Sequence, residues 1–460
     1  MPTAGKKHAR TRGKIVSGET LARLRRHHYE MNNGERPDIP DALTRRVARH
    51  LLPAISVAFL LNYLDRFNIS FAGLQMEESL GLSPLGFGWA GSCFAIGYLL
   101  FQIPANIGFM RIGARRWLGL LAIGWGSIVC LTGLVRTPME LYVARFLLGS
   151  VEAGFVPAIV LYLSWWFPTR MRTQTVAIYA QGVPIAGIIG GPLAGWLMTI
   201  FSTPGSSESW RALLFCEGAP SILVGLWILA TLPDTPRDAR WLSPPEAAGL
   251  SSASTLAGEP PRPITRAQIL SALRSPTVWR LCVTYFLLVG GTFGIVLWLP
   301  QFLRRPGWES PQVIGWISAI PWTFASAAII VASRVADRTR GFGRIAAISA
   351  VCAATAFALA GVVQDRWLVL GLMTIATASM LSLSVTFWGL PPEVLAGERA
   401  AVGIPIINAA GFIGALISPV AMGWIAQSLG SLRGGIVLSG VFLAGCAIAL
   451  ISWRRQFRIP

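Results

Sequence analysis

The chain has 460 residues, of which 53% are hydrophobic and 13% are charged. A soluble protein carries about 25% charged residues, so the composition excludes that class and indicates a protein that crosses a membrane many times. The net charge of +18 lies mainly in an N-terminal tail and in short loops. That distribution is typical of cytoplasmic segments of membrane proteins and argues against a nucleic-acid-binding protein.

Cysteine and histidine give no indication of a metal site, a disulfide framework or a cofactor. The six cysteines all lie in apolar segments, and no C-x-x-C spacing occurs. The sequence also lacks a nucleophile–base pair and a phosphate-binding loop, so an enzyme is not expected. The four histidines lie in or beside the tail, and any proton relay inside the membrane must therefore use carboxylates.

Residues 1–49 form a basic tail that lacks the pattern of a cleavable signal peptide. A membrane span needs about 20 mostly apolar residues, and twelve later segments meet this requirement. They are 50–72, 84–108, 115–136, 139–166, 174–200, 210–232, 276–302, 312–333, 344–363, 367–390, 400–426 and 433–453. Residues 233–275 interrupt the apolar pattern and divide the spans into six and six.

This division predicts an all-α membrane protein with twelve transmembrane helices in two pseudo-symmetric six-helix bundles. The bundles are expected over 50–232 and 276–453, with a linker over 233–275 and a short end over 454–460. Ser243 and Glu246 in the linker have the spacing of a capping box at the start of a short helix. Basic residues concentrate in the tail, the linker and alternate loops, which predicts a multi-pass inner-membrane protein with both termini in the cytoplasm.

Two landmarks recur in both halves at the same spacing. Arg111 and Arg338 follow the second and eighth spans, and Pro192 and Pro419 lie in the fifth and eleventh. The differences 338 − 111 and 419 − 192 are both 227. Parallel repeats of six helices are a transporter architecture in which the substrate site lies between the halves, near the middle of the membrane. A coincidence in a glycine-rich chain is the alternative.

Five local runs add to these landmarks. They are LNYLDRFNISFAGLQM, ARFLLGSVEAGFVPA, LPDTPRDARWLSPPE, WLPQFL and GIPIINAAGFIGALISP. Over about residues 50–455 the chain resembles the major facilitator superfamily, and the runs look like its anion:cation symporter family of organic-anion transporters. The resemblance implies the major facilitator fold and alternating access. It also implies a small organic anion and a proton as partners of a monomer in the lipid bilayer.

The resemblance further implies a latch at the cytoplasmic ends of the second and eighth spans. In the superfamily an acid, an arginine and a helix end hold one conformation closed there. The matching gating residues are Arg111, Arg115, Asp337 and Arg338. The first loop departs from the pattern because Met110 stands where the acid is usual, which weakens the expectation of a latch in the N-terminal half.

Four charged side chains interrupt the apolar spans: Asp65 and Arg66 in the first, and Arg145 and Glu152 in the fourth. A charge at the centre of a spanning helix costs roughly 3 kcal/mol on insertion scales, so such groups persist where they pair, line a watery cavity or have a function. Two basic and two acidic groups nearly cancel. This balance indicates a polar cavity built for an anion and a proton.

Arg66 is the first candidate substrate-binding residue. It shares a helix face with Asn62 and Ser70, at i−4 and i+4, whereas the adjacent Asp65 points about 100° away around the helix. A guanidinium binds a carboxylate through two parallel hydrogen bonds, and in the family that the chain resembles the matching arginine contacts the anion. Asn62 is a candidate on the same face. A structural ion pair of Arg66 with Asp65 or Glu152 is the alternative.

Asp65 and Glu152 are the candidate proton-coupling residues, since the matching acids have this role in the family. Arg145 and Glu152 lie on one helix face at i and i+7, so Arg145 is expected to orient the acid rather than to contact substrate. Burial disfavours a charged glutamate and a nearby arginine favours it, so movement of an arginine would switch proton affinity. A static salt bridge is the alternative. Glu217, near the outer surface, is expected to pair with Arg211 or another base.

The second half carries no matching charges. With the offset of 227, the four charged positions correspond to Thr292, Phe293, Leu372 and Ser379. The C-terminal wall of the cavity is therefore expected to be neutral, with Tyr285 and Asn408 as substrate-binding candidates, while Gln181 is a further candidate in the N-terminal half. Trp298 and Trp388 are aromatic candidates for the C-terminal wall, and packing in the core is the alternative for both.

Three functional hypotheses follow. The first is a secondary active transporter that imports a small organic carboxylate by proton symport. The second is an exporter of drugs or a carrier of neutral solutes, for which Arg66 would be dispensable. The third is a membrane sensor with the same fold that binds a ligand without moving it. Sugar acids, dicarboxylates, aromatic acids and pyridine carboxylates all suit the first hypothesis at this level.

Overall fold

The computed structural model of the chain describes residues 40–167, 181–253, 265–339, 341–395 and 398–457. These residues are almost entirely helical, and twelve helices among them are long and apolar enough to cross a membrane, as predicted. The N-terminal bundle contains α2 (Asp41–Ser79), α3 (Pro84–Ile112), α4 (Ala114–Thr132), α5 (Pro138–Glu152), α6 (Phe155–Trp166), α8 (Gly182–Ile200) and α9 (Ser209–Thr231). The C-terminal bundle contains α12 (Pro276–Leu303), α13 (Pro311–Thr339), α14 (Phe342–Val362), α15 (Arg366–Phe387), α16 (Leu390–Val394), α17 (Glu398–Leu429) and α18 (Arg433–Phe457).

Local sequence explains where several of these helices begin. The Ser83 hydroxyl accepts a hydrogen bond from the Gly86 N–H at 3.1 Å, and a proline follows it as the first residue of α3. Thr137 caps α5 in the same way, again with a proline at the first helical position. A hydroxyl cap satisfies one of the free N–H groups at a helix start, and proline there loses no hydrogen bond.

The first helix begins earlier than the sequence predicts. The apolar pattern predicts a span from residue 50, whereas α2 begins at Asp41. Contacts with the linker accompany the additional turns: His50 stacks on Trp241 with ring centroids 4.2 Å apart, and Arg46 pairs with Glu246 at 3.2 Å. Residues 174–180 of the predicted fifth span lie outside the described residues, as do residues 1–39 of the tail.

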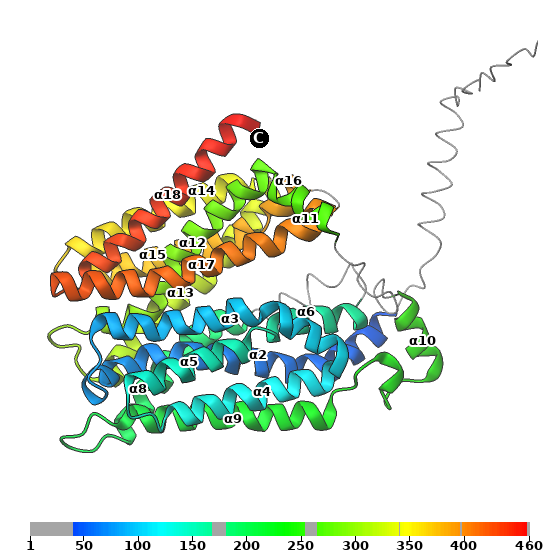
Figure 1. Cartoon of the computed structure of the whole chain (residues 1–460), viewed down its shortest axis with the longest axis horizontal. Helices are drawn as coiled ribbons and strands as arrows, with labels where there is room; N and C mark the ends of the chain where they lie inside the picture. The colour runs from blue at the N-terminus through cyan, green and yellow to red at the C-terminus, as the bar shows by residue number, and fades with distance from the viewer. Residues whose placement is uncertain (1–39, 168–180, 254–264, 340, 396–397, 458–460) are drawn as a thin grey trace, which may run out of the picture.

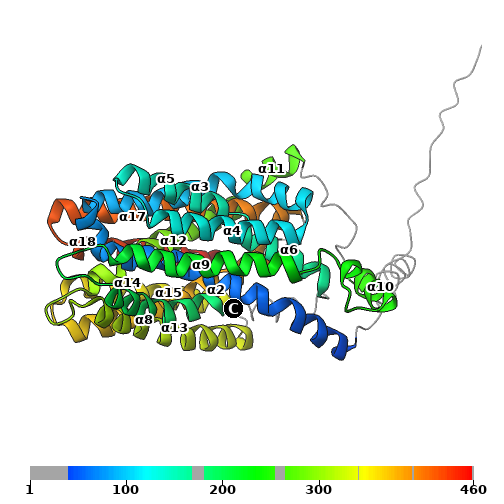
Figure 2. The same ribbon diagram turned by 90° about the horizontal axis from the view of Figure 1, so that it is seen from below.

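The linker contains a short 3-10 helix, η1 (Pro236–Asp238), followed by α10 (Pro244–Ala253) and α11 (Arg266–Leu273). One half of the predicted capping box is present, because the backbone N–H of Ser243 donates to Glu246 Oε2 at 2.9 Å, and the Ser243 hydroxyl donates to the same oxygen at 3.0 Å. These hydrogen bonds lower the pKa of Glu246. Figure 2 shows α10 beyond the end of the bundles, near the start of α2. We call this the linker end of the molecule.

The two bundles touch at the end opposite the linker and diverge toward the linker end (Figure 1). Contacts between bundles run mainly between α3 and α17 and between α8 and α13, with a smaller contact between α2 and α12. The Ser92 hydroxyl donates to the Leu416 carbonyl oxygen at 2.5 Å, and Arg304 Nη1 donates to the Leu74 carbonyl oxygen at 3.4 Å. The conformation is therefore closed at the end opposite the linker.

The closed end reproduces the repeat in three dimensions. A methyl group on Gly88 would lie 2.4 Å from the Pro419 carbonyl oxygen, and one on Gly315 would lie 2.3 Å from the Gly191 carbonyl oxygen. The two glycines are also 227 residues apart, since 315 − 88 is 227. Residues without side chains allow helices to cross this closely. The two crossings are thus equivalent positions of one repeated structure.

The fourth span is interrupted directly after Glu152. Helix α5 ends at that residue, and α6 begins at Phe155. Pro157 accounts for the break, because proline lacks an N–H and its ring clashes with the carbonyl group four residues earlier, here that of Ala153. The break places the Glu152 carboxyl at a helix end inside a spanning segment.

Candidate functional site

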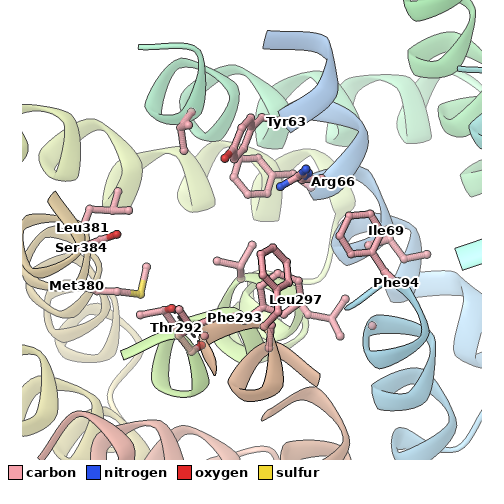
Figure 3. Close-up of a pocket in the computed structure, with 18 of the residues that line it drawn as sticks. Tyr63, Arg66, Ile69, Phe94, Thr292, Phe293, Leu297, Met380, Leu381 and Ser384 are labelled. Atoms are coloured by element: carbon pink, nitrogen blue, oxygen red, sulfur yellow. Dashed lines mark hydrogen bonds between the residues drawn. The ribbon is translucent and has the colours of Figure 1, made fainter. Parts of the chain in front are cut away.

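A cavity of about 260 Å³ lies between the two bundles. Helices of both halves line it, and seven of its 21 lining residues are aromatic. Figure 3 shows Arg66 pointing into this space from α2, with Ser384 facing it from the C-terminal bundle. The cavity therefore lies where the repeat predicts a substrate site, between the halves.

Arg66 lies between an acid, aromatic rings and the cavity. Its Nε donates to Glu152 Oε2 at 2.6 Å, whereas its Nη2 has no hydrogen-bond partner. The guanidinium carbon lies 5.0 Å from the centre of the Tyr63 ring and 5.4 Å from that of Phe94. Rings at this distance attract a cation. The guanidinium therefore packs against rings on the N-terminal side of the cavity, with Nη2 buried and unsatisfied.

Glu152 is completely buried, while the Arg66 side chain is 16% exposed. The ion pair of these two residues is the arrangement that the sequence offered as an alternative to substrate binding by Arg66. Glu152 Oε1 has no hydrogen-bond partner. Asn62 lies close to Glu152 and is also fully buried, so it does not line the cavity. Removing one partner of a buried ion pair costs about 3–5 kcal/mol because the other charge is left unpaired.

Arg145 lines the cavity from α5. Its guanidinium carbon lies 4.9 Å from the centre of the Phe94 ring, and its Nε donates to the Ala90 carbonyl oxygen at 3.4 Å. Within the described residues Arg145 has no ion pair, although it is only 4% exposed. Arg66, Arg145 and Glu152 together carry one formal positive charge in excess, and this excess favours an anion in the cavity.

Asp65 points away from the cavity, as its position next to Arg66 on the helix predicts. Its Oδ2 accepts a hydrogen bond from the Ser221 hydroxyl on α9 at 2.7 Å, and its Oδ1 has no partner. Glu217 lies one helical turn before Ser221 and close to Asn68 of α2. Both acids are buried, and among the described residues neither has an ion pair.

The expectation that Glu217 pairs with Arg211 is wrong. The Arg211 side chain pairs with Glu208 and donates to the carbonyl oxygens of Gly133 and Val135 at 3.0 and 2.6 Å. It is therefore held at the end of α9, near the surface opposite the linker. Asp65 and Glu217 remain as two buried acids on facing helices.

Of the other predicted binding residues, Tyr285 lines the cavity and the remaining ones lie elsewhere. Tyr285 lines the cavity and packs edge-on against Trp388, with ring centroids 5.0 Å apart. Gln181 is exposed and Asn408 is half-buried, and neither lines the cavity. Trp298 is fully buried against Phe87, with centroids 5.1 Å apart, in agreement with the alternative of core packing.

The predicted latch residues lie at the linker end. The Arg115 backbone N–H donates to Asp234 Oδ1 at 2.8 Å, and its side chain lies 4.0 Å from Asp234 Oδ2. An acid from the loop after α9 thus caps α4 in the half where Met110 replaces the usual acid. Arg111, Asp337 and Arg338 are exposed, and in the described part of the chain they form no ion pairs. This agrees with a molecule open at the linker end.

Several cavity residues were not predicted from the sequence. Tyr63 and Phe94 contact the Arg66 guanidinium, and Trp322, Met380 and Ser384 belong to the C-terminal lining. Tyr63 had a usable signal, because it lies three residues before Arg66 and so on a neighbouring face of the same helix. The other four lie in uniformly apolar spans, whose hydropathy does not distinguish a cavity face from a lipid face.

The predicted neutral C-terminal wall is confirmed. Every residue that the C-terminal bundle contributes to the cavity is uncharged. Thr292 and Phe293, the positions that the repeat pairs with Asp65 and Arg66, are both in the lining. Across the described residues no group of three or more histidine, cysteine or acidic side chains is placed to hold a metal ion.

The comparison with protein families decides the class of protein. Residues 55–419 match the profile of the Major Facilitator Superfamily. The chain belongs to this superfamily. A proposed tartrate transporter of Agrobacterium vitis is 33% identical to it over 415 residues, covering 90% of this chain and 95% of that protein. A quinolone resistance transporter of Acinetobacter baumannii is 31% identical, covering 92% of this chain and 97% of that protein.

Solved structures of major facilitators have the same fold. A bacterial homologue of the human lysosomal transporter Spinster, in an inward-facing and unoccupied conformation, superposes with a TM-score of 0.73. The match covers 91% of this chain and 98% of that one at 19% identity. The predicted twelve-helix major facilitator fold is therefore confirmed, and the chain is a multi-pass membrane transporter.

Proposed function

We propose that this major facilitator imports a small organic carboxylate together with a proton. One observation carries the proposal: Arg66 and Arg145 both line the cavity, and Glu152 is the one acid that pairs with either of them among the described residues. A carboxylate would supply the missing negative charge. The Arg66 Nη2 is buried and has no hydrogen-bond partner, so one of its donors remains unsatisfied beside the aromatic rings in this conformation.

Coupling follows from competition for Arg66. When Glu152 is ionised it holds the Arg66 Nε. A proton on Glu152 removes that charge and frees the guanidinium for two parallel hydrogen bonds to the substrate. Substrate and proton therefore favour each other's binding. Symport follows when the carrier changes its opening only with both bound or with neither bound. Asp65 and Arg145 are included as proton-coupling residues, Arg145 because it adds positive charge near Glu152.

The membrane orientation belongs to the same proposal. The basic residues of the tail and linker support a cytoplasmic location of the linker end in an inner-membrane protein. The end that the two glycine crossings close then faces outward. The conformation described is the one from which anion and proton leave. Arg111, Arg115, Asp337 and Arg338 are proposed to close the linker end in the other half of the cycle.

Uptake into proteoliposomes with an inwardly directed proton gradient tests the proposal. Wild-type protein should concentrate a labelled carboxylate and alkalinise a weakly buffered external medium. Arg66→Lys keeps the charge but loses the planar fork, and we expect about 100-fold lower uptake, since hydrogen bonds to charged groups contribute about 1.5–3 kcal/mol each. Glu152→Gln should abolish accumulation but keep exchange across the membrane.

The control for folding is the double variant Arg66→Ala/Glu152→Gln. It removes both charges of the buried pair, so its thermal stability should exceed that of Arg66→Ala alone. Wild-type uptake by Arg66→Lys would refute the role of Arg66. Accumulation against a gradient by Glu152→Gln would refute the proton role.

Export is the second candidate, because one relative is named for quinolone resistance. An exporter would lower the content of a cationic or neutral drug in cells, and its activity would survive Arg66→Lys. Net uptake of an acid that depends on Arg66 would exclude export as the main activity.

A further inference from the structure

We propose that the carboxylate carried by this protein is attached to an aromatic ring, rather than being a hydroxylated sugar acid or tartrate. This inference rests on the proposed function, because it assumes that Arg66 holds the carboxylate. It concerns the other end of the ligand, which the C-terminal wall of the cavity must accommodate.

The wall opposite Arg66 is apolar over most of its surface. Phe293, Val296 and Leu297 come from α12, and Met380 and Leu381 come from α15. A ligand that reaches from Arg66 into this wall buries its body against carbon atoms. Burial of apolar surface is favourable, whereas a hydroxyl group buried without a partner is costly.

Hydrogen-bonding groups are scarce on this wall. The Thr292 hydroxyl already donates to the Val289 carbonyl oxygen at 3.2 Å. Ser384 faces the cavity across from Arg66 (Figure 3). The hydroxyls of Ser384 and Tyr285 can satisfy a few polar groups at the far end of a ligand. They are too few for the several hydroxyls of a sugar acid, some of which would be left unpaired.

Aromatic side chains surround the space between Arg66 and this wall. Phe67 and Trp322 meet across the two bundles with ring centroids 4.9 Å apart, and Phe412 of α17 stacks on Tyr98 of α3 at 4.2 Å. Tyr285 adds a ring from α12. Flat rings pack on one another with offset or edge-on geometry, and this adds to the gain from burial alone. A planar ligand ring fits such surroundings better than a flexible polyhydroxylated chain.

Competition binding on the purified full-length protein tests the inference. Labelled benzoate is the probe, and benzoate, cyclohexanecarboxylate and tartrate are the competitors, each also measured with Arg66→Lys. We expect benzoate to bind at least about tenfold more tightly than tartrate, because each unpaired hydroxyl lowers affinity by about tenfold. Cyclohexanecarboxylate should lie between them, about two- to tenfold weaker than benzoate.

Variants of the wall sharpen the test. Trp322→Leu should weaken benzoate binding by about two- to tenfold. The matched control is Trp196→Leu on α8, whose side chain is 50% exposed and outside the cavity; it should leave binding unchanged. Leu381→Asn supplies a donor and an acceptor to the wall and should raise tartrate affinity relative to benzoate.

The outcomes separate the inference from the function on which it rests. Tartrate binding that is tighter than benzoate binding and is lost in Arg66→Lys would overturn the aromatic class but leave the carboxylate function intact. Equal binding of benzoate and cyclohexanecarboxylate would also overturn the aromatic class. Absence of Arg66-dependent binding by all three acids would overturn both.

Discussion

The two walls of the central cavity come from repeated halves, yet they differ in charge. On the N-terminal wall, Arg66 and Arg145 face the cavity, and Glu152 lies behind Arg66. On the C-terminal wall, the position equivalent to Arg66 is Phe293, and the lining is uncharged. The repeat thus preserves a cavity-facing position at Arg66 and Phe293 but not its chemistry. It does not preserve every such position, since Thr292 lines the cavity whereas the equivalent Asp65 does not. In the proposed function, one half holds the charge of the ligand and the proton, and the other half surrounds the body of the ligand.

A second contrast lies within α2. Arg66 faces the cavity and pairs with Glu152, whereas Asp65 faces α9 and accepts a hydrogen bond from Ser221. One residue of difference in position directs two charges into separate environments, because successive side chains diverge by about 100° around a helix. In the proposed function, the acid in contact with Arg66 responds to substrate directly, and Asp65 and Glu217 respond through movement of α2 against α9.

Exchanging the walls should have the largest effect. The double variant Arg66→Phe/Phe293→Arg moves the guanidinium to the opposite side of the cavity. It leaves Glu152 buried without a cation and gives the C-terminal wall an arginine without an acid. We expect uptake to fall by about 100-fold and thermal stability to fall with it, since an orphaned buried charge costs about 3–5 kcal/mol. Recovery of more than a tenth of wild-type uptake would show that the position of the charge is unimportant.

The next largest effect is expected from a variant that tests Asp65 independently of Arg66, since the two residues lie on different faces of α2. Asp65→Asn keeps the hydrogen bond from Ser221 but removes an ionisable group, and we expect about tenfold lower proton-driven accumulation, equivalent to about 1.4 kcal/mol. Counterflow exchange should change much less. Affinity for substrate should remain near wild type, because Asp65 does not line the cavity. The measurement is uptake and counterflow in one proteoliposome preparation. A large loss of substrate affinity would place Asp65 in the binding site after all.

Glu217→Gln is the matched variant on α9. Glu217 has no ion pair among the described residues, so its removal orphans no buried charge and should be tolerated by the fold. We expect full expression and a changed pH profile of uptake. Unfolding of Glu217→Gln would indicate a structural role instead.

A substitution that opposes closure of the end opposite the linker should have a smaller effect on uptake. A methyl group on Gly191 would lie 2.6 Å from the Gly315 carbonyl oxygen, so Gly191→Ala opposes the close crossing of α8 and α13. Overpacking costs about 1–3 kcal/mol, and we expect severalfold slower uptake and increased labelling of a cysteine placed at that end. Gly371→Ala is the control, because no atom lies within 4 Å of its added methyl group. Equal behaviour of the two variants would argue against the crossing as a gate.

The smallest effect is expected at the linker end. Asp234→Ala removes the acceptor for the Arg115 backbone N–H and should lower the stability of the folded protein by about 1 kcal/mol. Asp234→Asn retains an acceptor and should cost less. Asp337→Ala, the matched change in the C-terminal half, should leave stability unchanged, since Asp337 is exposed and forms no described ion pair. Thermal unfolding of the three variants in one detergent checks the order.

The fold was accessible from the sequence because its signals are local. Length and hydropathy predict the twelve spans, Ser243 and Glu246 predict the start of α10, and the offset of 227 predicts the neutral wall. The site was accessible only in part. Arg66 and Tyr285 line the cavity as predicted for substrate-binding candidates, but Gln181, Asn408 and Asn62 do not. Arg145 also lines it, although the sequence predicted that it orients the acid rather than contacts substrate. A polar side chain in a span can form its hydrogen bonds with a neighbouring helix instead of facing the cavity. The sequence does not identify which helix is the neighbour.

The sequence by itself determined the number of spans, the division into two bundles and the four charges that must be sheltered from lipid. Only the tertiary structure decided that Arg66 pairs with Glu152, that Asp65 turns to Ser221, and that Arg211 is already occupied by Glu208. The physical reason is that lipid and protein core are both apolar, so the apolar residues of a spanning helix do not distinguish its outer face from its inner face. Which face meets the cavity is fixed by packing between helices that are distant in sequence.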